Sequence, residues 1–261
     1  MGLRMSIRLI QNGESVIFLG HNNQINKEKL IKNGGLEAKT LQELVNKCDI
    51  IFLTVFDQRQ VEDIFFNNGL FNLLRKDMII ILSSTLDPNF CSNIAKKIMN
   101  DRKAHVLDAP ISGMPIGAET GNLTFFVGGS LEIYNKVLPI FEKMGNKIFH
   151  INEKVGSGQI IKLCNNILFI LNAFSVLEVT KLIKKSDLNI NTFIETVKNG
   201  TGDSFIVRNW EYLLKFAKNN EYYTRLIKKD LILASSFSKE KEVYLQLLEL
   251  ALKMNLDIPE N

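Results

Sequence analysis

The alternation of short apolar runs with helix-like segments, up to His150, constrains the fold more than any other feature of this chain. Continuously apolar runs such as DIIFLTV and DMIIIL are typical of strands that are covered on both faces. Helical periodicity separates most of these runs, so the sequence predicts βαβ units in a mostly parallel, doubly wound sheet. Strands are expected at residues 15–19, 49–55, 77–82, 105–107, 123–127 and 147–150.

Helical segments fill most of the intervals, and a change of pattern marks a domain boundary. Helices are expected at residues 1–13, ending at Gly13, and at 27–32, 41–47, 58–66, 88–99 and 131–144. From Gly158 onward the pattern is helical throughout, beginning with one long helix that runs to Asp187. We therefore expect an α/β domain over residues 1–152 and an all-helical domain over residues 153–261.

Charge and cysteine content exclude several classes of partner. The 32 basic and 28 acidic residues are mixed along the chain, so we expect no nucleic-acid partner. Three unpaired cysteines, with no metal-ligand spacing, indicate a reducing cytoplasm and no metal site. The most apolar stretch, residues 160–179, is interrupted by charges and amides, which predicts a buried helix and not a membrane span.

The strongest chemical motif is DAPISGMPIGAETGNLTFFVGG, from Asp108 to Gly129. Ser112 and Gly113 follow a predicted strand, where open α/β sheets bind ligands. A hydroxyl and unobstructed backbone N–H groups there could hold a carboxylate. The alternative is a glycine-rich connection with its prolines acting as rigid turn residues.

A second motif, GSGQIIKLCNN, covers Gly156 to Asn166 and opens the long helix. Lys162 and Asn166 are four residues apart and share one helical face. Partial desolvation would lower the pKa of a lysine there toward the range that is useful for proton transfer. The alternative is a lysine whose stem packs on the helix while its amine reaches water.

Together, the two motifs resemble the β-hydroxyacid dehydrogenase family, whose substrate loop reads D-x-P-V-S-G-G and whose catalytic helix reads G-x-G-x-x-x-K-x-x-x-N. Ile111 and Met114 depart from the loop pattern. The resemblance implies a Rossmann-type doubly wound, mostly parallel sheet lacking its first strand, followed by an all-α C-terminal domain. It also implies NAD or NADP as cofactor, a small 3-hydroxy acid or semialdehyde as substrate, and a homodimer or homotetramer.

The resemblance assigns roles to individual residues. Lys162 matches the catalytic lysine, which exchanges a proton with the substrate oxygen, and Ser112, Gly113 and Asn166 match substrate-holding positions. The cofactor-contacting positions match Gly2, Val55, Phe56, Gln60, Thr85 and Lys229. At Gly20-His21-Asn22 the chain has neither the arginine that suits a 2′-phosphate nor the acid that suits a free ribose, so NAD and NADP both stay open. Arg208 is either a second anion-binding group or an ordinary surface arginine.

The start of the chain leaves three interpretations open. Gly2 is either an ordinary second residue or the last glycine of a G-x-G-x-x-G fingerprint whose strand and first glycines lie upstream. The protein is then a working dehydrogenase with a misassigned start, a non-catalytic scaffold that has kept the fold, or a fragment without stable structure. The intact Lys162 and Asn166 favour the working dehydrogenase.

Overall fold

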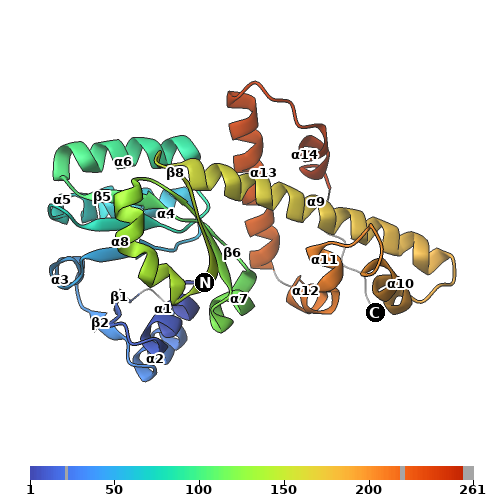
Figure 1. Ribbon diagram of the computed structural model, residues 1–261, viewed down its shortest axis with the longest axis horizontal. Helices are drawn as coiled ribbons and strands as arrows, with labels where there is room; N and C mark the ends of the chain where they lie inside the picture. Colours follow the sequence, from blue (N-terminus) through green and yellow to red (C-terminus); the bar gives the residue numbers. More distant parts are fainter. Residues whose placement is uncertain (21–22, 218–220, 255–261) are drawn as a thin grey trace. The chain divides into compact units, whose positions relative to one another are not determined.

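The computed structural model describes residues 1–20, 23–217 and 221–254 (Figure 1). The chain divides into two compact units, Met1–Lys162 and Leu163–Asn261, and each is described by itself. His21 and Asn22, which bear on the choice between NAD and NADP, lie outside the described residues.

The larger sheet of the first unit has the strand order β3-β4-β5-β7-β6, and β8 pairs with β7. Its strands are β3 (Ile50–Leu53), β4 (Ile79–Leu82), β5 (His105–Asp108), β6 (Ile111–Ser112), β7 (Leu123–Gly128) and β8 (Gly145–Asn152). The pairs β3–β4, β4–β5 and β7–β8 are parallel, in agreement with the predicted mostly parallel sheet. The two-residue strand β6 was not predicted, because it lies in the polar loop.

Strand β7 runs antiparallel to β5 and β6, which the sequence did not predict. Helix α7 (Met114–Thr120) precedes β7 and has seven residues. At 1.5 Å per residue it spans roughly 10 Å, whereas a six-residue strand spans roughly 20 Å. The helix is therefore too short to return the chain along the sheet for a parallel crossover.

Alternate residues of β4 enter two separate cores, which explains why the whole strand is apolar. Ile80 and Leu82 pack with helices on one face, whereas Ile79 and Ile81 pack with helices on the other. The first face is covered by α3 (Leu41–Lys47), α4 (Gln58–Glu62), a π-helical turn (Asp63–Asn67), α5 (Leu70–Leu73) and α6 (Pro88–Arg102). The second is covered by α1 (Gly2–Gln11), α7 and α8 (Leu131–Glu142).

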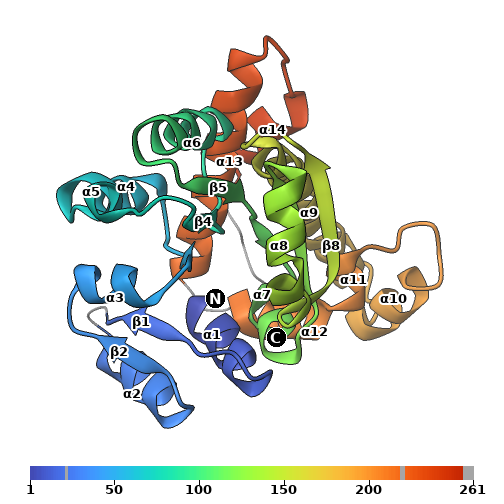
Figure 2. The ribbon, with the colours of Figure 1, turned by 60° about the vertical axis from the view of Figure 1, so that its left-hand side comes forward.

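A second, two-stranded sheet lies apart from the large one (Figure 2). It pairs β1 (Ile17–Leu19) in parallel with β2 (Leu36–Ala38), and α2 (Gln24–Lys32) connects them. Among the described residues no strand joins β1 to β3. A doubly wound sheet has its first strand between these two positions, so the split agrees with the predicted sheet that lacks that strand.

The second unit is helical in its described part, as predicted. Helix α9 (Ser157–Lys185) enters it from the first unit and is followed by α10 (Ile190–Val197), α11 (Phe205–Arg208), α12 (Trp210–Ala217), α13 (Glu221–Glu240) and α14 (Gln246–Ala251). Side chains of α9, α13 and α14 form its core, which includes Phe174, Leu231 and Leu248.

Helix α9 is buried on one face only, so the prediction of a buried helix was half right. Ile170 and Phe174 are buried, whereas Leu168 and Leu182 are exposed. Of the described helices, α9 has the length and apolar composition to cross a membrane, and 28% of its most apolar window is buried. One such helix is weak grounds for a membrane protein, because core helices meet the same criterion.

Candidate functional site

Two predicted cofactor positions lie at the carboxyl ends of the neighbouring parallel strands β3 and β4. Val55 follows β3, and Thr85 follows β4. The Ser84 hydroxyl joins the two loops, because it accepts a hydrogen bond from Val55 N and donates one to Val55 O, both at 2.8 Å. This is the edge at which open α/β sheets bind ligands.

Gly2 begins α1 beside the same loops. A methyl group added to Gly2 would lie 3.6 Å from Thr54 Cβ, so a larger side chain would fill the space between α1 and the end of β3. The N-terminus of α1 has no side-chain cap and no acidic residue in its first turn. An uncapped helix end next to loops at the carboxyl edge suits an anion such as a pyrophosphate. The residues present therefore fit a dinucleotide.

Phe56 and Gln60, two further predicted cofactor positions, are hydrogen-bonded to each other. The Gln60 side-chain oxygen accepts a hydrogen bond from Phe56 N at 2.8 Å, while Asp57 caps α4 through Gln60 N. This exchange resembles a capping box and fixes the loop after β3. The Gln60 side chain thus has a role in shaping the loop, whether or not it also contacts a cofactor.

The predicted substrate loop forms β6 and the start of α7. Ser112 ends β6, paired with Thr124, and Gly113 has a φ of 128°, which favours glycine. The next residue, Met114, has a φ of 60°, also in the left-handed region. The family pattern has glycine here, and the backbone explains why, since a Cβ atom is strained in this conformation.

Lys162 lies in the second turn of α9 and is 9% exposed. The helix that carries it is anchored at its N-terminus by Asp108, the last residue of β5. Asp108 Oδ1 accepts from Gly156 N at 2.7 Å, and Oδ2 accepts from Gln159 N at 2.8 Å. A carboxylate at this end also interacts favourably with the helix dipole. Burial raises the pKa of Asp108 to about 6, even though the backbone donors oppose the shift.

The two glycines of GSG are explained by close packing at this helix start. A Cβ on Gly158 would lie 2.1 Å from Phe126 O in β7. Gly156 has a φ of 102°, and a Cβ there would lie 2.4 Å from Pro88 O. The main chain of α9 therefore rests directly on β7 and on the start of α6, which fixes the height of the Lys162 turn above the sheet.

In the second unit, Asn166 and Lys229 both contact the carboxylate of Asp230. Asn166 Nδ2 donates to Asp230 Oδ2 at 2.6 Å, and Lys229 Nζ lies 3.0 Å from Asp230 Oδ1. Asp230 is 6% exposed, so this carboxylate is stabilised by partners from two helices, α9 and α13.

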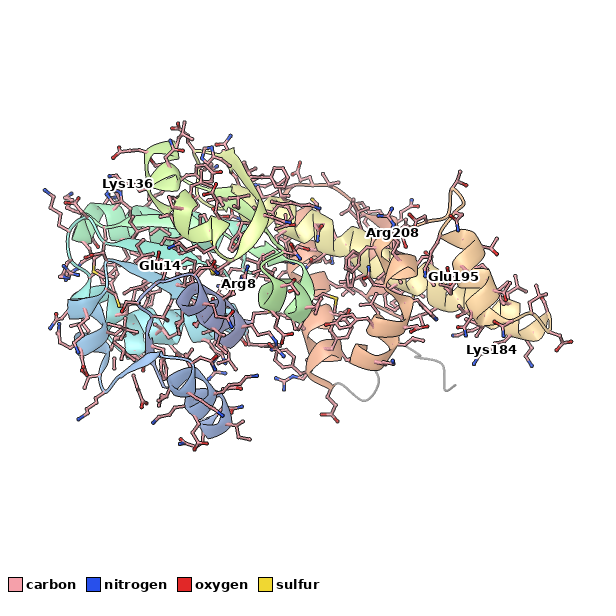
Figure 3. The ribbon with its side chains drawn as sticks, turned by 60° about the horizontal axis from the view of Figure 1, so that its bottom comes forward. Arg8, Glu14, Lys136, Lys184, Glu195 and Arg208 are labelled. Carbon is pink, nitrogen blue, oxygen red and sulfur yellow. The ribbon has the colours of Figure 1, made fainter. Side chains whose placement is uncertain are left out.

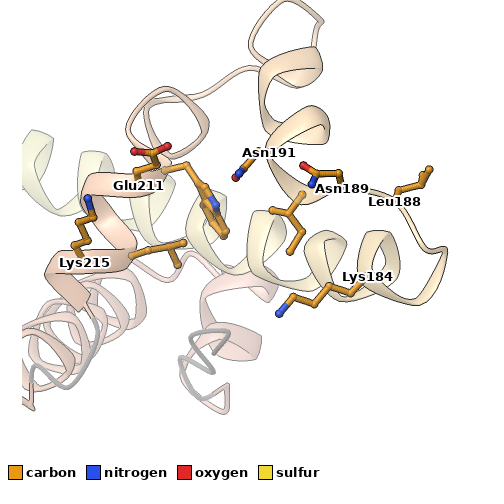
Figure 4. Close-up of a pocket in the computed structure, with 9 residues that line it drawn as sticks. Lys184, Leu188, Asn189, Asn191, Glu211 and Lys215 are labelled. Atoms are coloured by element: carbon orange, nitrogen blue, oxygen red, sulfur yellow. The ribbon is translucent and has the colours of Figure 1, made fainter. Parts of the chain in front are cut away.

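The remaining candidates lie elsewhere. Arg208, on the surface in Figure 3, pairs with Asp203 at 2.5 Å, as an ordinary surface arginine would. A cavity of about 640 Å³ in the second unit is shown in Figure 4, and none of the predicted site residues lines it. Its lining includes Lys184, Trp210 and Lys215. Across the described ranges, no three His, Cys, Asp or Glu residues cluster as metal ligands would.

Sequence reasoning missed three residues that build the site. Asp108 and Gln159 belong to the two motifs but had no predicted role, and Ser84 was not among the predicted residues. The sequence does contain a signal for them, namely a polar side chain next to an apolar stretch. A carboxylate, an amide or a hydroxyl that is buried there needs a hydrogen-bond partner. Each is less than 5% exposed.

Comparison with known proteins gives the family. Residues 1–152 match the NAD-binding domain of 6-phosphogluconate dehydrogenase. Residues 156–257 match the NAD-binding domain of NADP-dependent 3-hydroxyisobutyrate dehydrogenase. The solved structure of a 3-hydroxyisobutyrate dehydrogenase from Salmonella typhimurium superposes with a TM-score of 0.85 at 20% identity, covering 96% of this chain and 88% of that one. At that identity the likeness shows the fold.

Two curated relatives are more similar in sequence. The mitochondrial 3-hydroxyisobutyrate dehydrogenase of Drosophila melanogaster is 33% identical over 77% of this chain, and the match spans 61% of the fly protein, less than two thirds of its length. The 2-hydroxy-3-oxopropionate reductase of Escherichia coli is 30% identical over 92% of this chain and 81% of the bacterial protein. With its two-part fold and both of its motifs matched, this chain belongs to the β-hydroxyacid dehydrogenase family.

Proposed function

We propose that this protein is an NAD(P)-dependent oxidoreductase that interconverts a small 3-hydroxy acid and its carbonyl form, with Lys162 as the general acid and base. One observation carries the proposal. The lysine sits almost fully buried on a helix whose first turn is hydrogen-bonded to the strand end from which the Ser112 loop departs. A buried amine at that position is suited to exchanging a proton with a bound substrate.

Each group has a distinct role in this proposal. The uncapped first turn of α1 and the loops of Val55, Phe56, Gln60 and Thr85 bind the dinucleotide, together with Lys229. Ser112 Oγ and the backbone N–H groups at Gly113 hold the substrate carboxylate, and Asn166 holds the reacting oxygen. Gly2 keeps the approach to α1 open, because it has no side chain.

The proton follows the hydride in a balanced exchange. A nicotinamide held by these residues would supply the hydride chemistry, as hydride acceptor in the oxidation and hydride donor in the reduction. In oxidation the Lys162 amine takes the hydroxyl proton as the C–O double bond forms. In reduction the Lys162 ammonium donates that proton to the carbonyl oxygen.

Turnover by lysine variants tests the proposal. Nicotinamide absorbance is followed with a panel of C3–C5 hydroxy acids, with NAD⁺ and NADP⁺ in separate assays. Lys162→Ala is expected to lose at least about a hundredfold in kcat, the scale of a general acid–base contribution. Lys162→Arg should lose as much, because arginine keeps the charge but does not release its proton. Lys154→Ala, on the exposed approach to the same helix, is the control. Undiminished turnover in Lys162→Ala would refute the assigned role.

The assay also separates an enzyme from a non-catalytic scaffold, which nothing in the comparisons favours. A scaffold would bind neither cofactor nor substrate, and its melting temperature would not respond to either. We further propose that the functional division of the chain falls at residues 152 and 153 and that the protein works in the reducing cytoplasm. Its three cysteines, Cys48, Cys91 and Cys164, are free thiols.

We also propose a homodimer or homotetramer. The second unit exposes large apolar side chains along α9 and after it, with Leu168 at 64%, Leu182 at 66% and Leu188 at 59% exposure. Apolar residues along one helix are typical of a surface that another copy covers. Light scattering should give a mass that is a multiple of the chain mass, and Leu182→Glu should lower it. A monomer at micromolar concentration would refute this proposal.

A further inference from the structure

We propose that Gln159 is a positioning residue that joins the Thr85 loop to the helix of Lys162. It thereby holds the proposed cofactor loop and the proposed proton-transfer group at fixed positions relative to each other. The inference rests on the proposed function, because it assigns the Thr85 loop to the cofactor and Lys162 to the proton. Gln159 itself touches neither substrate nor cofactor in this proposal.

The Gln159 side chain spans the backbone on both sides of Thr85. Its Oε1 accepts a hydrogen bond from Leu86 N at 3.0 Å, and its Nε2 donates one to Ser84 O at 2.9 Å. The amide therefore pairs with this loop as a neighbouring strand would. Gln159 is 0% exposed, so water cannot replace either bond.

The same loop is tied in turn to the end of β3. The hydroxyl of Ser84 exchanges two hydrogen bonds with the main chain of Val55, at 2.8 Å each. Two of the proposed cofactor positions, Val55 and Thr85, are thus held by one serine and one glutamine. The Ser84 hydroxyl also lies 3.4 Å from Leu53 O, at the end of β3.

On its other side, Gln159 is fixed by Asp108. The main-chain N–H of Gln159 donates to Asp108 Oδ2 at 2.8 Å, and Gly156 N donates to Oδ1 at 2.7 Å. Lys162 follows Gln159 by three residues on the same helix, slightly less than one turn. Any shift of the first turn of α9 therefore moves Lys162 together with the loop that Gln159 holds.

The chemistry of the position requires an amide. Only a side chain with one donor and one acceptor at this reach satisfies Leu86 N and Ser84 O together. A carboxylate would lose the bond to Ser84 O and would stand next to the ionised Asp108. Methionine has nearly the same length and volume and makes neither bond, so Gln159→Met removes the connection with the least change in packing.

Two measurements on the full chain test the inference. In Gln159→Met, hydrogen exchange at the Leu86 amide should become at least about tenfold faster, because its buried acceptor is gone. In steady-state assays kcat/KM should fall by about a hundredfold, mainly through kcat, as expected for a misplacement on the ångström scale. The control is Ile98→Val in the buried face of α6, which lowers stability without touching the network.

The outcomes separate this inference from the proposed function. If neither the unaltered chain nor any variant turns over a substrate, the proposed function fails. Hydrogen exchange at the Leu86 amide then still tests the connection, which fails if exchange is unchanged in Gln159→Met. If the unaltered chain is active, kcat in Gln159→Met should drop well below that of Ile98→Val at a matched loss of melting temperature. Equal kcat in the two variants, or Leu86 exchange as slow as in the unaltered chain, would overturn the positioning role.

Discussion

Asp108 carries a stability cost that should depend on pH in an unusual direction. Burial raises the pKa of its carboxyl from 3.8 to about 6. Between those two values the folded chain binds a proton that the unfolded chain does not. Stability associated with Asp108 therefore rises as the pH falls through this window, opposite to the usual behaviour of a paired carboxylate.

The size of the effect follows from the shift. A difference of about two units, at 1.36 kcal/mol per unit, corresponds to about 3 kcal/mol between pH 7.5 and pH 4. Asp108→Asn carries no titrating group at this position, so it is the reference. The free energy of unfolding of the unaltered chain, minus that of Asp108→Asn, should increase by up to about 3 kcal/mol over this range.

Urea unfolding, followed by circular dichroism at several pH values, measures this difference. Other titrating groups contribute to both proteins and cancel to first order, because the substitution changes one side chain. A difference that stays constant with pH would show that the carboxyl is not destabilised by burial. A difference that decreases toward low pH would show that the backbone donors at Gly156 and Gln159 outweigh desolvation, and the reasoning would fail.

Three further substitutions test the geometry. Gly158→Ala should lower the free energy of unfolding by about 3 kcal/mol, because its Cβ would lie 2.1 Å from a main-chain oxygen of β7. Gly200→Ala is the control in the same denaturant titration, and it should cost far less because its nearest contact is an ordinary 3.7 Å. Met114→Gly should stabilise the protein by about 1 kcal/mol by relieving a φ of 60°, measured as a raised melting temperature; a lowered one would contradict the strain. Asn166→Leu should cost about 1–3 kcal/mol, because Asp230 Oδ2 loses its 2.6 Å donor, and stability equal to that of the unaltered chain would show that the bond is dispensable.

The sheet was predictable because its strands are apolar on both faces. Ile79 to Leu82 is buried at every position, and a run of this kind has few alternatives to a covered strand. Helix ends were predictable where caps have a chemical signature, as with Asp87 and Pro88 at the start of α6. Strand β2 was missed because its three residues, Leu36 to Ala38, are too few to show a period.

The candidate site was less predictable than the fold. Motif letters led to Lys162 and Ser112, but nothing in their spacing shows that Asp108 anchors the helix from another strand, 48 residues away from Gly156. Hydrogen bonds of this kind depend on tertiary contacts, and local periodicity carries no information about them. The same holds for the pairing of Asn166 with Asp230, which are 64 residues apart in sequence.

The complete burial of Asp108 has a kinetic consequence. With 0% of its surface exposed, its carboxyl has no direct route for exchanging a proton with bulk water. Exchange must wait for a transient opening in which the start of α9 lifts from the end of β5. The rate at which this carboxyl equilibrates after a pH jump would then measure how often the start of the helix that holds Lys162 opens.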